Sequence, residues 1–410
     1  MAKPLSLFEA FGIELEYMIV AADSLDVRPI TDRVLHAVAG AFEAEVELGD
    51  ISWSNELALH VIELKTTGPV GSLESLSKRF QANVARINDL LLSHDARLMP
   101  TAMHPWIDPH AELKLWPHEY NAVYEAYNRI FDCTGHGWAN LQSVHLNLPF
   151  ANDEEFGKLH AAIRLLLPLL PALAASSPII ERRASGICDT RLEVYRTNSR
   201  RVPSVSGLVI PEPVYTREAY EREIFAKMYA DIAPLDPDGT LQHEWLNSRG
   251  AIARFDRNAI EIRVLDIQEC PAADLAICSL IVDTLRRLVA EEWSSTAAQQ
   301  SLATERLASI LSSAIRDADG AIIEDPEFLH AFGGSAPVTA GELWRRLATP
   351  LLESSSEFGA PLRIILEQGP LSRRILKQFA NASTDASLFE TYRKLCNCLA
   401  TGKLFRPNEA

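Results

Sequence analysis

The sequence has few of the residues that staple small domains together. Only six of its 410 residues are cysteines, and a chain of this length can bury a core without cross-links. They lie at positions 133, 188, 270, 278, 396 and 398, and no two are separated by the two residues typical of a zinc ribbon. We therefore expect reduced thiols and a cytoplasmic protein.

Long apolar runs are also missing. The most apolar segment, residues 165–175, is about half of the roughly 20 residues that a membrane span needs, and Pro168 and Pro171 interrupt it. Residues 1–11 lack the basic flank, apolar run and small-residue cleavage site of a secretory leader. We expect neither secretion nor a membrane partner.

Basic side chains are in the minority, with 39 Lys and Arg against 55 Asp and Glu and a net charge of −16 at pH 7. Nucleic acids attract clustered positive charge, so we expect no nucleic-acid partner. A composition of 47% hydrophobic and 23% charged residues is typical of a globular protein with one large domain or two ordinary ones. The excess of carboxylates needs another explanation.

Periodicity indicates the order of the elements. Alternation of apolar and polar residues predicts strands over residues 12–22, 57–67, 140–150, 251–255 and 259–266. Three- and four-residue spacing of apolar residues predicts helices over residues 72–93, 116–131, 153–175, 217–230, 272–292 and most of 301–399, with Asn152 or Asp153 capping the third. Asp256, Arg257 and Asn258 suit a hairpin. Strands mixed with helices, followed by a helical tail, favour an α+β fold with antiparallel pairing.

Several predicted strands carry two polar side chains on one face and aliphatic side chains on the other, because residues two apart share a face. The polar pairs are Glu14 with Glu16, His145 with Asn147, and Glu261 with Arg263. An ordinary solvated face would more often show Lys, Thr and Ser. Carboxylates suit hard divalent cations, and arginine suits phosphate. The pattern therefore predicts a polar cavity that holds divalent cations and a phosphorylated ligand.

Each pair alone also fits a simpler interpretation. Two strand glutamates can face solvent, a strand histidine can be structural, and Glu261 with Arg263 can be an ordinary ion pair. Glu56 and Glu63 are seven residues apart, which places them on opposite faces of a regular strand. A shared role for them requires a turn or bulge after Glu56.

Six segments together carry a likeness to a known family. In order, they are GIELEY (12–17), NELALHVIELKTTGP (55–69), MHPW (103–106), SVHLNLPF (143–150), ALAASSPIIERRASGICDTR (172–191) and AIEIRVLD (259–266). They resemble the glutamate-cysteine ligase type 2 family of carboxylate-amine ligases, distant relatives of glutamine synthetase. The likeness covers roughly residues 8–290.

The resemblance implies a glutamine-synthetase-like catalytic fold, in which a curved antiparallel sheet holds ATP, Mg²⁺ (or Mn²⁺) and glutamate on its concave face and helices pack outside. We expect one catalytic domain over residues 1–410. Residues 1–290 form its motif-bearing core, and residues 291–410 form a helical C-terminal extension packed on it. The implied partners are the small molecules glutamate, ATP and an amine acceptor, and the likeness also allows a homodimer.

The resemblance also implies roles for individual residues. One metal ion, near the ATP phosphates, has the ligands Glu14, His145 and Glu261, and a second has Glu16, Glu56 and Glu63. Arg263 neutralises the transferred phosphate and is catalytic together with Glu261. His145, Asn147 and Arg263 contact the nucleotide, and Arg191 and Arg254 hold the substrate carboxylate.

The implied reaction converts the γ-carboxylate of glutamate to an acyl phosphate, which an amine then displaces to form an amide. Cysteine is the default acceptor, because no motif fixes the amine pocket. The chain departs from the family pattern at Asn258-Ala259, where Gly-Thr is usual, and at Asn147, where many relatives have His or Gly. These departures affect the nucleotide contacts and Arg254.

The sequence speaks against other functions. A metal-dependent amide hydrolase would favour a His-Glu-x-x-His motif, but Asn247 stands where His243-Glu244 would need the second histidine. A catalytically inactive ATP- and glutamate-binding relative is disfavoured by the retained Glu14, His145 and Arg263. A P-loop enzyme is disfavoured, because Gly402-Lys403 lacks the rest of that motif.

Overall fold

An antiparallel sheet organises the amino-terminal part of the chain in the computed structural model, which describes residues 4–380 and 384–407. The termini of the chain at 1–3 and 408–410, and 381–383 within the predicted helical tail, lie outside the described residues. The sheet has the order β2-β3-β4-β1-β6-β10-β9, and β5 also pairs with β1. Its strands are β1 (Gly12–Ala21), β2 (Glu45–Glu47), β3 (Ile51–Asn55), β4 (Val61–Thr66), β5 (Ala96–Met99), β6 (Ser143–Pro149), β9 (Ala251–Arg254) and β10 (Ala259–Asp266). The predicted α+β class with antiparallel pairing is confirmed.

The strand predicted over residues 57–67 was wrong in its first half. Residues 61–66 form β4, whereas residues 56–60 connect β3 to β4, and Asn55 pairs with Ile62 across that connection. The backbone N–H of Leu59 is instead bonded to the carbonyl of Lys114. All five residues of β3 are buried, so this strand lacks the alternation that marks a half-exposed strand. The chain therefore turns after Glu56, which is the condition for Glu56 and Glu63 to share a site.

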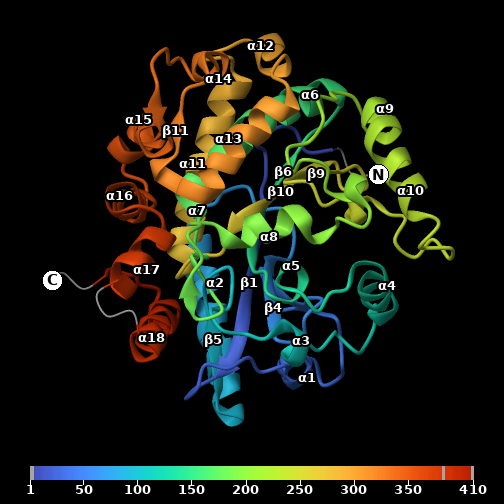
Figure 1. Cartoon of the computed structure of the whole chain (residues 1–410), viewed down its shortest axis with the longest axis vertical. Helices are drawn as coiled ribbons and strands as arrows, with labels where there is room; N and C mark the ends of the chain where they lie inside the picture. Colours follow the sequence, from blue (N-terminus) through green and yellow to red (C-terminus); the bar gives the residue numbers. More distant parts are fainter. Residues whose placement is uncertain (1–3, 381–383, 408–410) are drawn as a thin grey trace.

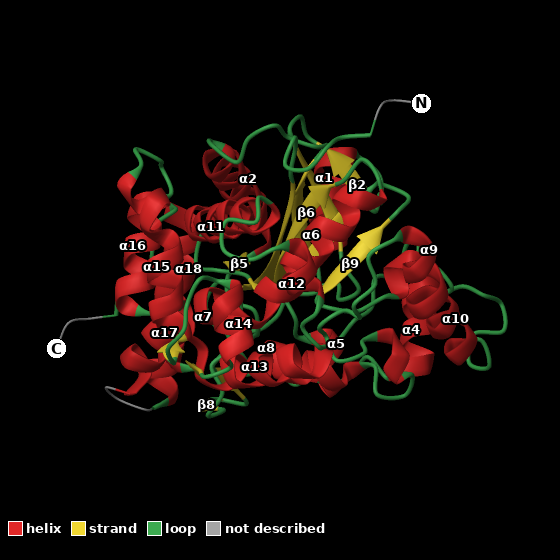
Figure 2. Ribbon diagram, turned by 90° about the horizontal axis from the view of Figure 1, so that it is seen from above, coloured by secondary structure: helices red, strands yellow, loops and turns green. Residues whose placement is uncertain are grey.

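One face of the sheet is apolar and packs on helices. Ile13 and Leu15 of β1, Leu146 of β6 and Ile262 of β10 are buried in a core that also contains Phe80 and other side chains of the covering helices. These helices are α2 (Leu76–Leu91), α6 (Asp153–Leu166) and α11 (Pro271–Val289). Figure 2 shows α2 and α11 on one side of the sheet. The opposite face is left for polar side chains.

The remaining helices before the tail are α1 (Thr31–Ala39), α3 (Pro109–Glu112), α4 (Asn121–Phe131), α5 (His136–Ala139), α7 (Pro171–Ala174), α8 (Thr190–Asn198), α9 (Arg217–Tyr220) and α10 (Ala226–Ile232). The periodicity did not predict α1, α3, α5 and α8. The helix predicted over 153–175 ends at Leu166 and resumes as α7, because prolines at 168 and 171 cannot donate the backbone bonds of a continuous helix. Asn152 caps α6 by accepting from the Glu155 amide at 3.0 Å. In Figures 1 and 2, α4, α9 and α10 lie across the sheet from α2 and α11.

The helical tail is confirmed as α12 (Thr296–Gln300), α13 (Thr304–Asp317), α14 (Pro326–Ala331), α15 (Ala340–Glu353), α16 (Gly359–Gln368), α17 (Leu371–Ala380) and α18 (Asp385–Thr401). Apolar side chains of α13 to α16 join the core beneath the sheet, whereas α17 and α18 pack in a second cluster with Met18 and Val20 of β1. A fully buried ion pair between Glu269, just after β10, and Arg374 of α17 also links the tail to the sheet. The tail therefore packs on the motif-bearing part of the chain, and its status as an extension of one domain stays a prediction.

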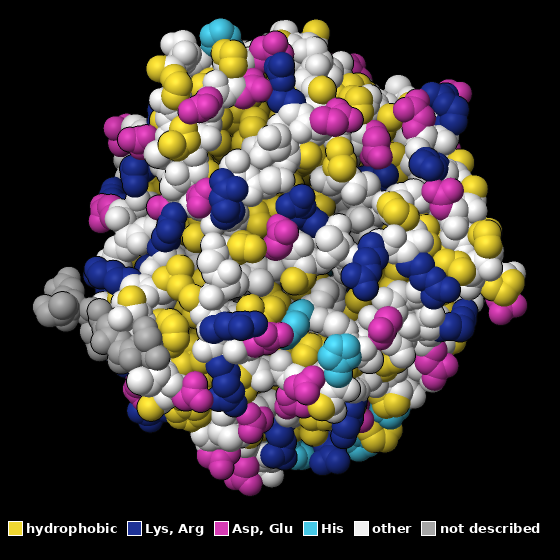
Figure 3. Space-filling model, in the orientation of Figure 1, with side chains coloured by type: hydrophobic (Ala, Val, Ile, Leu, Met, Phe, Trp, Pro, Cys, Tyr) yellow, Lys and Arg dark blue, Asp and Glu magenta, His cyan; other side chains and the backbone are white. Residues whose placement is uncertain are grey.

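The surface agrees with a chain whose charges are dispersed. On the face shown in Figure 3, acidic and basic side chains are interspersed rather than separated into fields of one sign. All six cysteines are free thiols, as expected. Among the helices within residues 4–380 and 384–407, none is both long and apolar enough to cross a membrane.

Candidate active site

The polar face of the sheet gathers the predicted site residues. Glu14 of β1 lies directly opposite His145 of β6 on one side and Lys65 of β4 on the other. In the same way, Glu16 lies opposite Glu63 of β4. A cavity of about 770 Å³ opens over this face, a size typical of small-molecule sites. Of the predicted residues, it is lined by Glu14, Glu56, Glu63, His145, Asn147, Arg254, Glu261 and Arg263.

Gly12 allows β1 and β6 to place these side chains close together. A Cβ atom at Gly12 would meet the Cβ of Asn147, its partner across the strands, at 3.0 Å. The Asn147 amide donates to Glu14 Oε1 at 2.9 Å. Asn147 therefore positions the Glu14 carboxylate, and it also lines the cavity where the resemblance implies a nucleotide contact.

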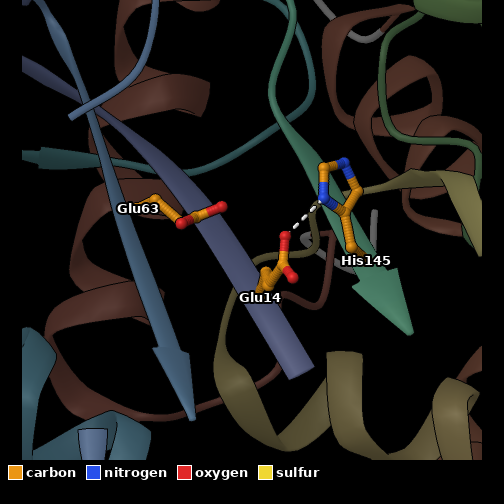
Figure 4. Close-up of side chains that lie close together, drawn as sticks. All are labelled: Glu14, Glu63 and His145. Atoms are coloured by element: carbon orange, nitrogen blue, oxygen red, sulfur yellow. Dashed lines mark hydrogen bonds and ion pairs between the residues drawn. The ribbon is translucent and has the colours of Figure 1, made fainter. Parts of the chain in front are cut away.

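Glu14 and His145 are bonded to each other at the centre of this polar face. Figure 4 shows them pointing toward each other, with His145 Nδ1 at 2.7 Å from Glu14 Oε2. Burial disfavours the imidazolium, but the bond to Glu14 and the charges of Glu14, Glu261 and Glu16 together raise the pKa of His145 to about 9. Burial likewise opposes ionisation of Glu14, yet the bond to His145 and the charges of His145 and Lys65 together hold the pKa of Glu14 well below its usual range. In the metal-free protein the pair is therefore a buried ion pair.

A second group of carboxylates lies beside this pair. Ser54 Oγ donates to Glu63 Oε1 at 2.6 Å, and Lys65 Nζ lies 3.2 Å from the same oxygen. Burial and the charge of Glu14 raise the pKa of Glu63 to about 7. Burial and the charges of Glu16 and Glu63 raise the pKa of Glu56 well above its usual value. The cluster thus holds more carboxylates than its own cations balance.

Two sets of these side chains are spaced for cations. The candidate ligand atoms of Glu14, Glu63 and His145 lie within 4.8 Å of one another, and so do those of Glu16, Glu56 and Glu63. Oxygen-rich donor sets of this kind fit Mg²⁺ or Mn²⁺. The second set has the three residues that the sequence analysis assigned to one ion. The first has Glu63 in place of the expected Glu261, which lies 3.8 Å from His145 Nδ1 but outside both sets.

The other end of the cavity carries arginines. Arg263 Nε lies 3.3 Å from Glu261 Oε1, and Arg254 Nη1 lies 3.6 Å from Glu261 Oε2. Burial disfavours the cation of Arg263, but the charge of Glu261 together with those of Tyr195, Tyr127 and Glu14 raises the pKa of Arg263. Arg257 of the β9–β10 hairpin also lines this end. Arg254 and Arg263 thus face the carboxylate of Glu261, whereas Arg257 Nε lies 3.8 Å from Asp256 Oδ2. Guanidinium groups at this position suit an anionic ligand.

The structure does not bring Arg191 to the cavity. This residue is 2% exposed, and its guanidinium donates to the carbonyl of Arg263 at 3.0 Å and lies 3.4 Å from Asp266 Oδ1. Through these contacts Arg191 stabilises β10, and its side chain does not line the cavity. The geometry therefore gives no support to the predicted contact of Arg191 with the substrate carboxylate.

Sequence reasoning also missed residues that line the cavity. Their charged and aromatic members include Lys65, Tyr124, Trp245 and Arg257. Lys65 shares a strand face with Glu63, two residues earlier, so the alternation could have indicated it. Trp245 lies in the 3₁₀ turn Glu244–Leu246, outside the sheet, where no periodicity of the sequence indicates its position.

Comparisons with known proteins give a consistent family likeness. The model of the family described as "Glutamate-cysteine ligase family 2 (GCS2)" matches residues 10–394. An uncharacterized protein of Archaeoglobus fulgidus is 32% identical over 377 residues, which cover 92% of this chain and 95% of that protein. A Nocardioides sp. protein named "Putative glutamate--cysteine ligase 2-1" is 31% identical over 150 residues, 37% of this chain and 35% of that protein.

Solved structures support the fold. The glutamate–cysteine ligase of Francisella tularensis, solved in complex with AMP, superposes with a TM-score of 0.60 at 12% identity over 97% of this chain and 90% of that one. The bifunctional glutathione synthetase of Pasteurella multocida superposes with a TM-score of 0.55 at 14% identity over 95% of this chain. The chain spans 52% of that bifunctional enzyme.

Proposed function

The chain belongs to glutamate-cysteine ligase family 2, and on that premise we propose that it is an ATP-dependent carboxylate-amine ligase that joins the γ-carboxylate of glutamate to an amine. The observation that carries the proposal is the placement of two carboxylate sets and three arginines around one cavity of about 770 Å³. Divalent cations and guanidinium groups together can bind the triphosphate of ATP and the carboxylate of glutamate.

The residues fit a pair of divalent cations without rearrangement of the backbone. Glu14, His145 and Glu63 would hold one ion, and Glu16, Glu56 and Glu63 the other. Bound there, Mg²⁺ would offset the charge of the triphosphate and of the carboxylate being activated. His145 must be neutral to act as a ligand, so loading of its site releases the proton that it shares with Glu14.

The remaining groups act on the substrates directly. A carboxylate is a poor electrophile, and transfer of the γ-phosphoryl group of ATP converts it to an acyl phosphate. Arg263 and Arg254 are placed to offset the charge of the transferred group. Glu261, between these arginines, fixes their guanidinium groups. The amine then attacks the activated carbonyl, and phosphate leaves.

Release of ADP and phosphate tests the proposal. Purified protein would be supplied with Mg-ATP, glutamate and a panel of amines that includes cysteine, and we expect ADP release that requires both glutamate and an amine. A folded protein that binds Mg-ATP but releases no ADP with any amine would be an inactive relative instead. Cleavage of the amide product without ATP would favour the hydrolase alternative.

A further inference from the structure

Lys65 of β4 lines the cavity, and the proposed reaction gives it no role. It follows Glu63 by two residues, so both side chains lie on the polar face of the sheet. In the register of β1 and β4, Lys65 is directly opposite Glu14, and Glu63 is directly opposite Glu16. A lysine therefore lies among the carboxylates that we assign to divalent cations.

Two carboxylates share the Lys65 ammonium. Its Nζ lies 2.8 Å from Glu45 Oε2 and 3.2 Å from Glu63 Oε1. Glu45 belongs to β2 at the edge of the sheet, and its side chain is 45% exposed, whereas that of Glu63 is 7% exposed. The ammonium thus bridges a solvated carboxylate and a buried one. The buried one, Glu63, is the member that the two candidate metal sets have in common.

Lys65 and a divalent cation would compete for the same carboxylate. Glu63 Oε1 already accepts from Ser54 Oγ at 2.6 Å and faces Nζ. An ion bound by Glu63 brings two positive charges close to the ammonium, in a buried setting where like charges repel more strongly than in water. The four-carbon stem of lysine is flexible, so Nζ can leave Glu63 and keep its contact with Glu45 while the backbone stays in place.

We propose that Lys65 is a built-in competitor of the divalent cations: its ammonium neutralises Glu63 in the metal-free protein and is held by Glu45 alone once an ion is bound. This inference rests on the metal sites of the proposed function and adds a control of their occupancy. Lys65 lowers the affinity for the ions, and Glu45 raises it by holding Nζ away from Glu63. In the metal-free protein the same ammonium limits the repulsion among the buried carboxylates.

Binding of Mn²⁺ tests this competition without turnover. Protein freed of metal with EDTA and then of the chelator would be titrated with MnCl₂ at constant pH, and the electron paramagnetic resonance signal of free Mn²⁺ gives the bound fraction. Lys65→Met keeps the length of the side chain without its charge, and we expect about 10-fold tighter binding. Lys65→Arg keeps the charge, and its affinity should stay within about 3-fold of the wild type. Equal affinity of the wild type and Lys65→Met would overturn the proposal.

Glu45 provides a test of opposite sign at an exposed position. We expect Glu45→Gln to weaken Mn²⁺ binding about 3-fold, because Nζ then remains on Glu63. Glu47→Gln removes the same charge from the same strand, outside the cavity, and controls for net charge. When Lys65→Met is already present, Glu45→Gln should have no more effect than Glu47→Gln. Equal effects of the Glu45 and Glu47 changes in the wild-type background would refute the role of Glu45.

Thermal unfolding separates competition from a purely structural role of Lys65. In EDTA, Lys65→Met should melt at a lower temperature than the wild type, because Glu63 has lost its cation. Saturating MnCl₂ should narrow or reverse this difference, since the ion then takes the place of the ammonium and binds the variant more tightly. A loss of stability that is equal in EDTA and in MnCl₂ would assign Lys65 a structural role and overturn the proposal.

ADP release distinguishes the failure of this inference from the failure of the proposed function. Release that requires glutamate and an amine, together with unchanged Mn²⁺ affinity of the Lys65 and Glu45 variants, would refute the competition and leave the ligase. The expected shifts in Mn²⁺ affinity without ADP release from any amine would refute the ligase and support the competition. Failure of both the wild type and Lys65→Met to bind Mn²⁺ would refute the metal sites and this inference with them.

Discussion

Glu14 and His145 are 131 residues apart in the sequence, yet they face each other across β1 and β6 with 2.7 Å between Glu14 Oε2 and His145 Nδ1. The register of the two strands sets this contact, because Glu14 is directly paired with His145. The contact also explains why each group favours its charged form despite burial. A change at either residue should therefore affect the charge of the other.

The first prediction concerns the carboxylate of this pair. Glu14→Gln keeps the shape of the side chain but removes a proposed metal ligand, and we expect kcat to fall by about 10³-fold or more. Steady-state ADP release in the presence of glutamate and an amine measures it, with thermal unfolding as the check on folding. Glu305→Gln, an exposed change on α13, serves as the control. Unaltered turnover of Glu14→Gln would refute the metal assignment.

The second prediction concerns Mg²⁺ and the shared carboxylate cluster. Because Glu16, Glu56 and Glu63 crowd together, a cation that binds the folded state should raise the melting temperature. At 100 times its Kd, a ligand adds about 2.7 kcal/mol of stability. Thermal scans in EDTA and in MgCl₂ measure the shift for the wild type and for Glu56→Gln. We expect the variant to lose most of the shift, and an equal shift in both proteins would contradict a role for Glu56.

The third prediction separates two roles for Arg191. Its guanidinium is the cation beside Asp266, and burial raises the pKa of both Asp266 and its neighbour Asp189. Arg191→Met leaves these carboxylates without their cation, and we expect a loss of about 3–5 kcal/mol in the free energy of unfolding. Urea denaturation measures this loss.

A milder variant keeps that prediction open to refutation if Arg191→Met does not fold. Arg191→Lys retains the charge but loses the paired geometry of the guanidinium. We expect it to lower stability while the KM for glutamate changes less than about 2-fold. A large rise in the KM for glutamate with unchanged stability would restore the substrate contact implied by the resemblance.

Local alternation was sufficient to predict the strands that carry most of the site. Residues two apart on β1, β6 and β10 share a face wherever the strand is regular, so the pairs Glu14 with Glu16 and His145 with Asn147 followed from the sequence. That these pairs lie in one cavity depends on the order and register of the strands, and alternation within a single strand carries no information about either. The order of the family motifs supplied that expectation.

Interactions between distant segments explain one wrong prediction, the strand through Glu56, and one assignment that the geometry does not support, that of Arg191. A continuous strand through Glu56 fits the local pattern, but the fully buried β3 and its pairing with β4 replace the first half of that strand. Arg191 lies in a family-like segment, yet Asp266 and the carbonyl of Arg263 attract its guanidinium away from the cavity. Burial of an arginine beside a carboxylate 75 residues away leaves no local signal in the sequence.

The last prediction concerns acid stability and His160 of α6, which lies far from the proposed chemistry. This ring is fully buried and stacks on Phe156 at 5.3 Å between centroids, and burial lowers its pKa from 6.5 to about 3. Between those two pH values the unfolded chain binds a proton that the folded protein does not, so stability should fall as the pH decreases from about 6.5 toward 3. The contribution of one such group approaches about 1.4 kcal/mol per pH unit.

Urea denaturation at pH 7 and at pH 5 measures this contribution of His160. The His160→Gln variant should lose less stability than the wild type when the pH is lowered from 7 to 5. An equal loss in both proteins would show that other groups dominate, with the buried His60 and His104, whose pKa values burial also lowers, as the next to test.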